Sequence, residues 1–372
     1  MNIADIDKNL AYTVITEKDI KWLNARETPF SLHGVSYSEE ERCYRRMNKE
    51  IANAKGLGEG VPYLSLCTAG GRLRFKTDSP YLALKCVMPN ADILEHMTMV
   101  GSFGFSVYAD GVYQGKYAPI WKNILNPLEG EVAKEGWWSK TERGKVAYDG
   151  IRYFSQTGLH DIELYFPLYG GVIELYIGVK DGSKILPPND YTYTKPVVFY
   201  GSSITQGGCA SRSSNDYVST VCRWLDTDYL NLGFSGSAKG ERVMVEYLAT
   251  LAPSVYVIDY DHNAPTVEYL RATHLPLYET LRASHPDTPI VFMTKPDCDY
   301  DADAPARREV IYKTYQTAIE RGDSNVAFID GKELFGKENR DACTVDCCHP
   351  NDLGFYRMAK TVYPVLKKYL EK

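Results

Sequence analysis

The sequence has few of the features that mark membrane proteins or nucleic-acid-binding proteins. Apolar residues never continue for the ~18 positions that a membrane-spanning helix needs, so we expect no membrane partner. The net charge is −6 at pH 7, and lysine and arginine form no basic block. Because a phosphate backbone normally binds a basic surface, we also expect no nucleic-acid partner.

Signals for secretion are scarce as well. The first residues, MNIADIDKNLAYTVITEKD, lack the basic start and apolar stretch of a signal peptide. The nine cysteines are an odd number without the spacing of a disulfide framework. These features predict reduced thiols and a cytoplasmic location, although a chain whose signal peptide had been removed would look the same.

The first half of the sequence has the pattern of a β domain. Short segments rich in β-branched and aromatic residues are separated by turn residues such as Gly, Asp and Pro. The predicted strands cover residues 63–68, 72–77, 81–87, 103–109, 112–118, 151–154, 161–166 and 172–179. So many short strands in sequence predict an all-β sandwich of the jelly-roll type. The pattern before residue 62 fits either a strand or a helix packed against either domain.

The second half alternates short apolar segments with helical patterns. This alternation predicts a parallel sheet between two helical layers. The five predicted strands are 197–200, 229–232, 254–259, 289–294 and 325–329, and the helices are 215–225, 241–251, 267–284, 305–322 and 352–370. The proline-containing stretch 186–195 separates the two patterns. We therefore divide the chain into a β domain, residues 1–190, and an α/β domain, residues 191–372.

One stretch of the second half, PVVFYGSSITQGG at 196–208, ends an apolar strand in a turn of glycines and serines. In a parallel sheet, ligands bind beyond the carboxyl ends of the strands. Glycines beside Ser203 let backbone N–H groups approach a bound oxyanion. The stretch alone also fits an ordinary strand-to-helix turn, and it is no phosphate loop because no lysine follows the glycines.

Three later segments indicate which function this stretch has. They are NLGFSG at 231–236, YDHN at 260–263 and DCCHP at 346–350, and together with GSSIT they resemble the sequence blocks of the SGNH, or GDSL-type, hydrolases in order. The resemblance implies a flavodoxin-like, five-stranded α/β/α domain. It also implies a catalytic triad of Ser203, His349 and Asp346, and an oxyanion hole formed by Ser203, Gly236 and Asn263. The usual block-one aspartate is replaced by Ser202.

The chemistry of these residues supports the same assignment. In D-x-x-H a short loop can place Asp346 against Nδ1 of His349, which leaves Nε2 to act as base for Ser203. His349 could instead cap the last helix, since Pro350 follows it. Gly236 and Asn263 could likewise be ordinary turn residues.

A zinc site is the main alternative for this region. Cys343, Cys347, Cys348 and His349 are close in sequence, but their spacing does not match paired zinc knuckles. A metal on His349 would also remove the base. We therefore expect neither a metal nor another cofactor.

The substrate is suggested by resemblance alone. AGGRLRFKTDSPY, HDIELYFPLYGGVIELYIG and YGSSITQGGCASR resemble the SGNH branch with an N-terminal jelly roll, above all the acetyl-mannan esterases of carbohydrate esterase family 17. This implies a serine esterase that removes O-acetyl groups from plant-derived oligosaccharides, first of all from acetylated β-mannan. The alternatives are an acetyl-xylan esterase, a lipid or small-molecule acyl hydrolase or acyltransferase, and a carbohydrate-binding protein with an inactive site.

Aromatic side chains are candidates for sugar binding. Trp121, Trp137 and Trp138 fall between two predicted strands, and exposed indoles can stack on sugar rings. His262, beside Asn263, can also contact substrate. Core or interface packing explains the tryptophans equally well, and a structural hydrogen bond explains His262 at least as well. The oligomeric state stays open.

Overall fold

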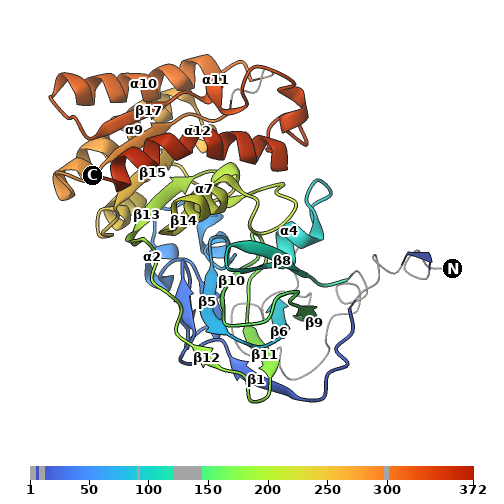
Figure 1. The fold of residues 1–372 in the computed structure, drawn as a ribbon. Helices are drawn as coiled ribbons and strands as arrows, with labels where there is room; N and C mark the ends of the chain where they lie inside the picture. Colours follow the sequence, from blue (N-terminus) through green and yellow to red (C-terminus); the bar gives the residue numbers. More distant parts are fainter. Residues whose placement is uncertain (1–5, 8–12, 90–92, 121–144, 297–300) are drawn as a thin grey trace.

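The computed structural model describes residues 6–7, 13–89, 93–120, 145–296 and 301–372. It has two parts, a mostly antiparallel β domain formed by the first half of the chain and an α/β domain formed by the second (Figure 1). The predicted fold class, a β domain followed by a five-stranded parallel α/β domain, is confirmed. The jelly-roll topology itself stays a prediction.

Two sheets build the N-terminal domain. The first has the strand order β1 (Ile20–Asn24), β11 (Glu174–Lys180), β6 (Tyr81–Pro89) and β9 (Lys145–Tyr153). The second has the order β12 (Ile185–Leu186), β5 (Arg72–Thr77), β10 (His160–Tyr165), β7 (Phe105–Ala109) and β8 (Val112–Tyr117), with β2 (Ser31–His33) beside β5. Alternate residues of both sheets, such as Phe75 and Leu84, share one buried core. Burial of this apolar surface holds the sandwich together.

One predicted strand of this domain is wrong. Residues 61–64 form a short helix, α3 (Val61–Leu64), rather than the start of a strand at 63–68. Pro62 occupies its first turn, where a missing N–H has no cost. Val61 and Leu64 pack into the core of the C-terminal domain, so their apolar character reflects contact between the domains. A second helix, α4 (Met99–Phe103), replaces the start of the strand predicted at 103–109.

The segment before residue 62 contacts both domains. Its strands β1 and β2 extend the two sheets of the N-terminal domain. The hairpin β3 (Ser36–Ser38) and β4 (Cys43–Arg45) follows, and then helix α2 (Lys49–Ala52). Ala52 packs into the core of the C-terminal domain.

A five-stranded parallel sheet forms the centre of the C-terminal domain. Its order is β14 (Thr227–Gly233), β13 (Tyr193–Gly201), β15 (Val255–Asp259), β16 (Ile290–Met293) and β17 (Val326–Ile329). One face is covered by α7 (Tyr217–Leu225) and α12 (Asp352–Leu370). The other face is covered by α8 (Arg242–Leu248), α9 (Val267–Ser284) and α10 (Ala304–Glu320).

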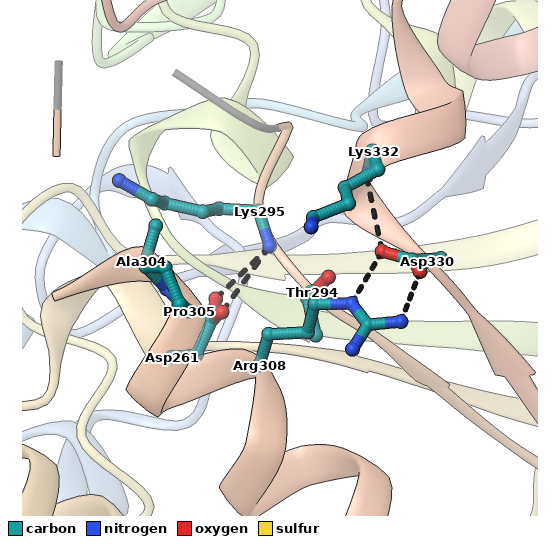
Figure 2. A pocket seen from close by; sticks show the side chains of 8 residues that line it. All are labelled: Asp261, Thr294, Lys295, Ala304, Pro305, Arg308, Asp330 and Lys332. Carbon is teal, nitrogen blue, oxygen red and sulfur yellow. Dashed lines mark hydrogen bonds and ion pairs between the residues drawn. The ribbon is translucent and has the colours of Figure 1, made fainter. Parts of the chain in front are cut away.

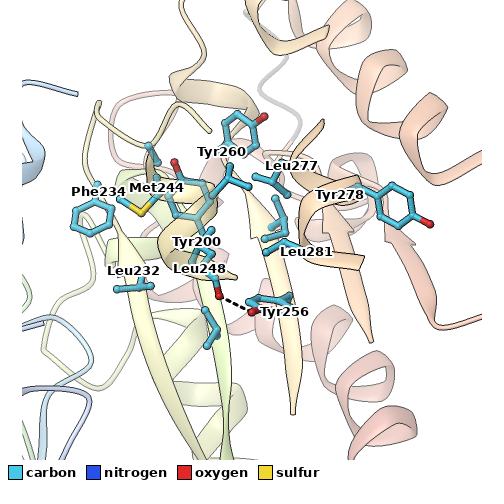
Figure 3. Packing of buried hydrophobic residues seen from close by; sticks show 14 of the residues in the cluster. Tyr200, Leu232, Phe234, Met244, Leu248, Tyr256, Tyr260, Leu277, Tyr278 and Leu281 are labelled. Carbon is cyan, nitrogen blue, oxygen red and sulfur yellow. Dashed lines mark hydrogen bonds between the residues drawn. The ribbon is translucent and has the colours of Figure 1, made fainter. Parts of the chain in front are cut away.

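The central strand β13 is apolar on both faces because helices cover both faces of the sheet. Val197 and Phe199 pack toward α7 and α12, whereas Val198 and Tyr200 pack toward α8 and α9. Figure 3 shows the second of these layers, with Tyr200 among aromatic and aliphatic neighbours. A continuous apolar run in the sequence was therefore the correct signal for this strand.

Buried arginines of the N-terminal domain fasten the edge strand β14. Arg72 is fully buried and pairs with Asp228, and it donates to the carbonyl oxygen of Tyr229 at 3.2 Å. Arg46 donates to the carbonyl oxygens of Asn231 at 3.0 Å and Gly233 at 2.8 Å. The β domain thus covers a sheet edge that would otherwise be open, and it lies beside the turn that follows β14.

Within the described part of the chain, no helix combines the length and the apolar character that crossing a bilayer requires.

Candidate active site

Ser203 lies at the carboxyl end of the central strand. Strand β13 ends at Gly201, and Ser203 is the first residue of the short helix α6 (Ser203–Gln206). Ser202 caps this helix, since its Oγ accepts a hydrogen bond from the Ile204 N–H at 3.2 Å. The Ser202 side chain thus hydrogen-bonds to the backbone. Of the two serines, Ser203 is the one whose hydroxyl points toward the candidate base.

Ser203, His349 and Asp346 form a hydrogen-bonded chain. Ser203 Oγ lies 2.9 Å from His349 Nε2, and His349 Nδ1 lies 2.7 Å from Asp346 Oδ2. Asp346 Oδ1 accepts from the backbone N–H groups of His349 at 2.7 Å and Cys348 at 3.1 Å. This arrangement lets Nε2 accept the serine proton while the carboxylate stabilises the imidazolium that forms.

The charge of Asp346 is secured by its surroundings. Burial alone would raise the pKa of this carboxyl, but hydrogen bonds from the ring and backbone of His349 outweigh burial and hold the pKa below its usual value. Asp346 therefore stays ionised at neutral pH.

The loop that carries Asp346 and His349 is closed by its own backbone. The N–H of Val345 donates to the carbonyl oxygen of His349 at 3.0 Å. Asn351, not His349, caps α12 by accepting from the N–H groups of Leu353 and Gly354. The helix-capping alternative for His349 is therefore wrong, and its ring is free to contact Ser203 and Asp346.

Gly236 and Asn263 lie in the turns that follow the two neighbouring strands. Gly201 is in register with Gly233 on one side and Asp259 on the other, so the three turns begin at the same level. Asn263 lies in the short 3₁₀ helix η4 (Asp261–Asn263), and its Nδ2 donates to the carbonyl oxygen of Phe234 at 2.9 Å. The amide has a second N–H, which remains available for an oxyanion.

Gly236 has a backbone that suits its predicted role. Its φ is +64°, and a Cβ built there would meet no atom within 4 Å. The N–H of Ser235, next to it, donates to Gln206 Oε1 at 3.0 Å, which ties this turn to the helix of Ser203. The fold thus brings the turns of Ser203, Gly236 and Asn263 to one edge of the sheet, with open space beside the glycine.

Of the other residues predicted to bind substrate, His262 lies in the described part of the chain and the three tryptophans do not. His262 lies beside this edge, with Nε2 3.1 Å from Cys348 Sγ. Burial, with the nearby Lys295 charge, lowers the pKa of His262 to about 4, so its ring is neutral. Trp121, Trp137 and Trp138 lie outside the described residues.

Two residues of the N-terminal domain lie beside the triad without having been predicted. The ring centroid of His96, in the loop between β6 and α4, is 5.7 Å from that of His349. The Tyr169 hydroxyl is buried next to Gly208, where an added Cβ would lie 2.9 Å from that hydroxyl and 3.3 Å from His349 Cδ2. Neither residue has a local sequence pattern that points to the site, since both lie in loops of the other domain.

The cysteines that suggested zinc are not gathered around one point. Cys343 is buried against Arg357, Cys347 is exposed, and Cys348 contacts His262. Among the described residues, the metal-ligating side chains that do come together are His96, Cys209 and His349, whose donor atoms all lie within 4.8 Å of one another.

A small polar cavity lies behind η4, at the carboxyl ends of β16 and β17 (Figure 2). Asp261 accepts from the backbone N–H of Lys295 at 3.2 Å, and Arg308 pairs with Asp330 on the opposite wall. Its volume of about 20 Å³ suits one water molecule. This cavity is therefore too small for a substrate.

The two domains of the chain match two different protein families. Residues 194–367 match the GDSL-like Lipase/Acylhydrolase family. Residues 20–185 match a family described as the N-terminus of SGNH hydrolase-type esterases. No curated protein matches the chain.

Several solved structures have the same two-part fold. A GDSL-like lipase from Bacteroides ovatus ATCC 8483 is 26% identical, with a TM-score of 0.78 over 95% of this chain and 98% of that chain. The salicylyl-acyltransferase SsfX3 of a tetracycline biosynthetic pathway is 19% identical, with a TM-score of 0.72 over 95% and 98%. The acetyl xylan esterase Est2A of the rumen bacterium Butyrivibrio proteoclasticus is 13% identical, with a TM-score of 0.56 over 95% and 99%. At such identities the last two show a shared fold alone.

Proposed function

We propose that this carboxylic ester hydrolase, whose residues 194–367 match the GDSL-like lipase/acylhydrolase family and whose residues 20–185 match the N-terminus of SGNH hydrolase-type esterases, removes O-acetyl groups from plant-derived oligosaccharides. Acetylated β-mannan is the first candidate substrate and acetylated xylan the second. The reaction needs no metal.

The proposed reaction uses the hydrogen-bonded chain at the end of β13. Ser203 Oγ attacks the acetyl carbonyl carbon as His349 Nε2 takes the hydroxyl proton, and Asp346 stabilises the resulting imidazolium. The N–H groups of Ser203 and Gly236 and the Nδ2 of Asn263 stabilise the oxyanion, each contributing roughly 3 kcal/mol. His349 then gives this proton to the departing sugar oxygen, which leaves as a hydroxyl group while the acetyl group stays on Ser203. A water molecule that loses a proton to the same ring attacks this acetyl ester, and His349 returns the proton to Ser203 Oγ as acetate is released.

The main support for a short acyl group is that little space surrounds the nucleophile. Ser203 is only 4% exposed. Gly208, beside the triad, leaves no room for a side chain, because a Cβ there would lie 2.9 Å from the Tyr169 hydroxyl and 3.3 Å from His349 Cδ2. A small acetyl group suits this space better than a long acyl chain, which would clash or stay in water.

The sugar side of the proposal rests on the neighbouring domain. His96 and Tyr169 bring the β domain to the edge of the reaction centre, so a substrate larger than its acyl group would contact that domain. Exposed aromatic side chains can stack on sugar rings, and Trp137 and Trp138 are the candidates that the sequence offers.

An acyl-chain series of chromogenic esters tests the acyl preference. We expect kcat/KM to fall by roughly tenfold or more for an acyl chain that is longer than the space beside Ser203, since a methylene that clashes with the pocket costs about 1–3 kcal/mol. Rates that rise with chain length would instead favour a lipid or small-molecule acyl hydrolase. Formation of a new ester when alcohols are added, at the expense of free acid, would favour an acyltransferase.

Acetylated oligosaccharides test the sugar preference. Replacing Trp137 and Trp138 by alanine should lower kcat/KM on mannan and xylan oligosaccharides, with little change on the chromogenic acetate. Contacts with sugar rings can contribute binding energy only when the substrate contains those rings. Trp224→Ala is the matched control, since Trp224 packs against Tyr356 and Tyr363 on the outer side of α7. Equal losses on both substrates would show that Trp137 and Trp138 are structural.

A further inference from the structure

Three side chains from separate loops converge beside the nucleophile. His96 comes from the N-terminal domain, Cys209 follows the helix of Ser203, and His349 precedes α12. Their donor atoms all lie within 4.8 Å of one another. The proposed reaction uses His349 but gives no role to the other two.

Two imidazoles and a thiol are a ligand set for soft or borderline cations. Zn²⁺ binds histidine nitrogen at roughly 2.0 Å and cysteine sulfur at about 2.3 Å, which in a tetrahedral site leaves donor atoms roughly 3.5 Å apart. The three side chains thus need to approach one another by only about 1 Å to hold the ion. The half-buried position of both histidine rings lets an ion reach them from solvent.

We propose that Zn²⁺, or a cation of the same class such as Cd²⁺, binds to His96, Cys209 and His349 and inhibits the enzyme by occupying its base. This inference rests on the proposed role of His349 in ester hydrolysis. The site is inhibitory, so it differs from the structural zinc site that the cysteine-rich segment suggested.

The hydrogen bonds of His349 define how the ion competes. Asp346 holds Nδ1 at 2.7 Å, so the lone pair of Nε2 faces Ser203 Oγ at 2.9 Å. An ion on Nε2 takes that lone pair from the serine proton and leaves the bond to Asp346 intact, as in other carboxylate–histidine–zinc arrangements. Ser203 then has no base.

The Cys209 thiol determines which kinds of metal ion can bind at this site. The Cys209 thiol is buried, so the ion must displace the thiol proton to bind sulfur. Zn²⁺ and Cd²⁺ form strong bonds to thiolate, whereas Mg²⁺ and Ca²⁺ prefer oxygen ligands. Inhibition should therefore be seen with the first pair of ions and not with the second.

Inhibition of chromogenic acetate hydrolysis is the first test. His96→Ala and Cys209→Ser should each raise the Zn²⁺ concentration for half inhibition at least tenfold, when the rate of each variant is expressed relative to its own rate in the presence of a chelator. Cys347→Ser is the matched control, because this exposed thiol is close to His349 in sequence but outside the set. It should leave the inhibition unchanged. Equal inhibition of the parent protein and both ligand variants would overturn the proposal.

A spectroscopic test does not depend on activity. Cd²⁺ titrated into the Cys347→Ser protein should give a thiolate-to-metal charge-transfer absorption in the ultraviolet. The band should persist when Ser203→Ala is added and disappear when Cys209→Ser is added. A band that survives Cys209→Ser would move the ion to another thiol and overturn the site, whatever the protein hydrolyses.

Discussion

The two domains contribute to the candidate active site in different ways. The C-terminal domain supplies every side chain of the proposed reaction from turns at one edge of its parallel sheet. The N-terminal domain supplies neighbours of the reaction centre, His96 and Tyr169, from loops between its strands. The register of the parallel sheet thus positions the residues of the proposed reaction. The packing of the N-terminal domain against the C-terminal one positions the residues around them.

This difference follows from how each set of residues is held. Gly201, Gly233 and Asp259 are in register, which fixes the turns after β13, β14 and β15 relative to one another. The loops of His96 and Tyr169 reach the site because contacts between the domains hold them there, among them the bonds of Arg72 and Arg46 to β14 and the bond from Gln206 Nε2 to the Leu168 carbonyl oxygen at 3.2 Å. Changes in the first set should abolish activity, and changes in the second should act through stability or the substrate.

The largest effect is expected at the nucleophile. Ser203→Ala should lower kcat by roughly 10⁴- to 10⁶-fold, because the other two members of the triad cannot act without it. The matched control is Ser202→Ala, which removes the cap of α6, costs about 1 kcal/mol of stability and should leave most of the activity. Steady-state hydrolysis of a chromogenic acetate measures both, and a reversed order would make Ser202 the nucleophile.

The next largest effect is expected at the carboxylate. Asp346→Asn should lower kcat by roughly 10⁴-fold, less than His349→Ala at roughly 10⁶-fold, because Asp346 orients and stabilises a base that still works poorly without it. Both rates are measured on the same acetate. Activity of Asp346→Asn close to that of the parent protein would remove the aspartate from the triad.

Loss of the buried arginine between the domains should affect stability. Arg72→Met removes the buried partner of Asp228, while this carboxylate keeps its bond with His33 at 3.1 Å, so the free energy of unfolding should fall by about 3 kcal/mol. Arg242→Met, which breaks an exposed pair with Glu246, is the control and should change stability by less than about 0.5 kcal/mol. Urea unfolding measures both variants. Similar small effects would mean that the domain contact does not depend on this ion pair.

The smallest effect is a pH dependence in the helix behind the site. Burial raises the pKa of Asp216 to about 6, although its hydrogen bonds with Ser219 oppose the rise. The unfolded carboxyl has a pKa of about 3.9, so the contribution of Asp216 to the free energy of unfolding should fall as pH rises from about 4 to 6, by about 3 kcal/mol in all.

Asp216→Asn removes this ionisation while keeping an acceptor for the Ser219 N–H, which Asp216 Oδ1 binds at 2.8 Å. The variant should therefore gain stability relative to the parent protein between pH 4 and 7. Urea unfolding at both pH values measures the difference. A difference that does not change with pH would show that folding does not raise the pKa of Asp216.

The sequence predicted the C-terminal domain more fully than the N-terminal one. Parallel strands buried on both faces give continuous apolar runs, and the residues after them are brought together by the sheet itself. For that reason Ser203, His349 and Asp346 could be named from their blocks and are found in one hydrogen-bonded chain. Their catalytic roles remain the subject of the mutations above.

What the sequence missed depends on contact between distant segments. The apolar residues at 63–68 suggested a strand, but Val61 and Leu64 form a helix that packs on the other domain. His96 and Tyr169 could not be placed, because only the docked domains bring their loops to His349. The function of Ser202 was also hidden, since a helix cap is visible only once the helix is known.

The most direct test of the central claim is to identify the residue that becomes acylated. A fluorophosphonate ester, which reacts with activated serines, should label the protein once, and mass spectrometry of its peptides should place the label on Ser203. His349→Ala should prevent labelling, because the unactivated hydroxyl is a weak nucleophile. A label on Ser202 or on another residue, or equal labelling of His349→Ala, would contradict the account of Ser203 as the nucleophile activated by His349.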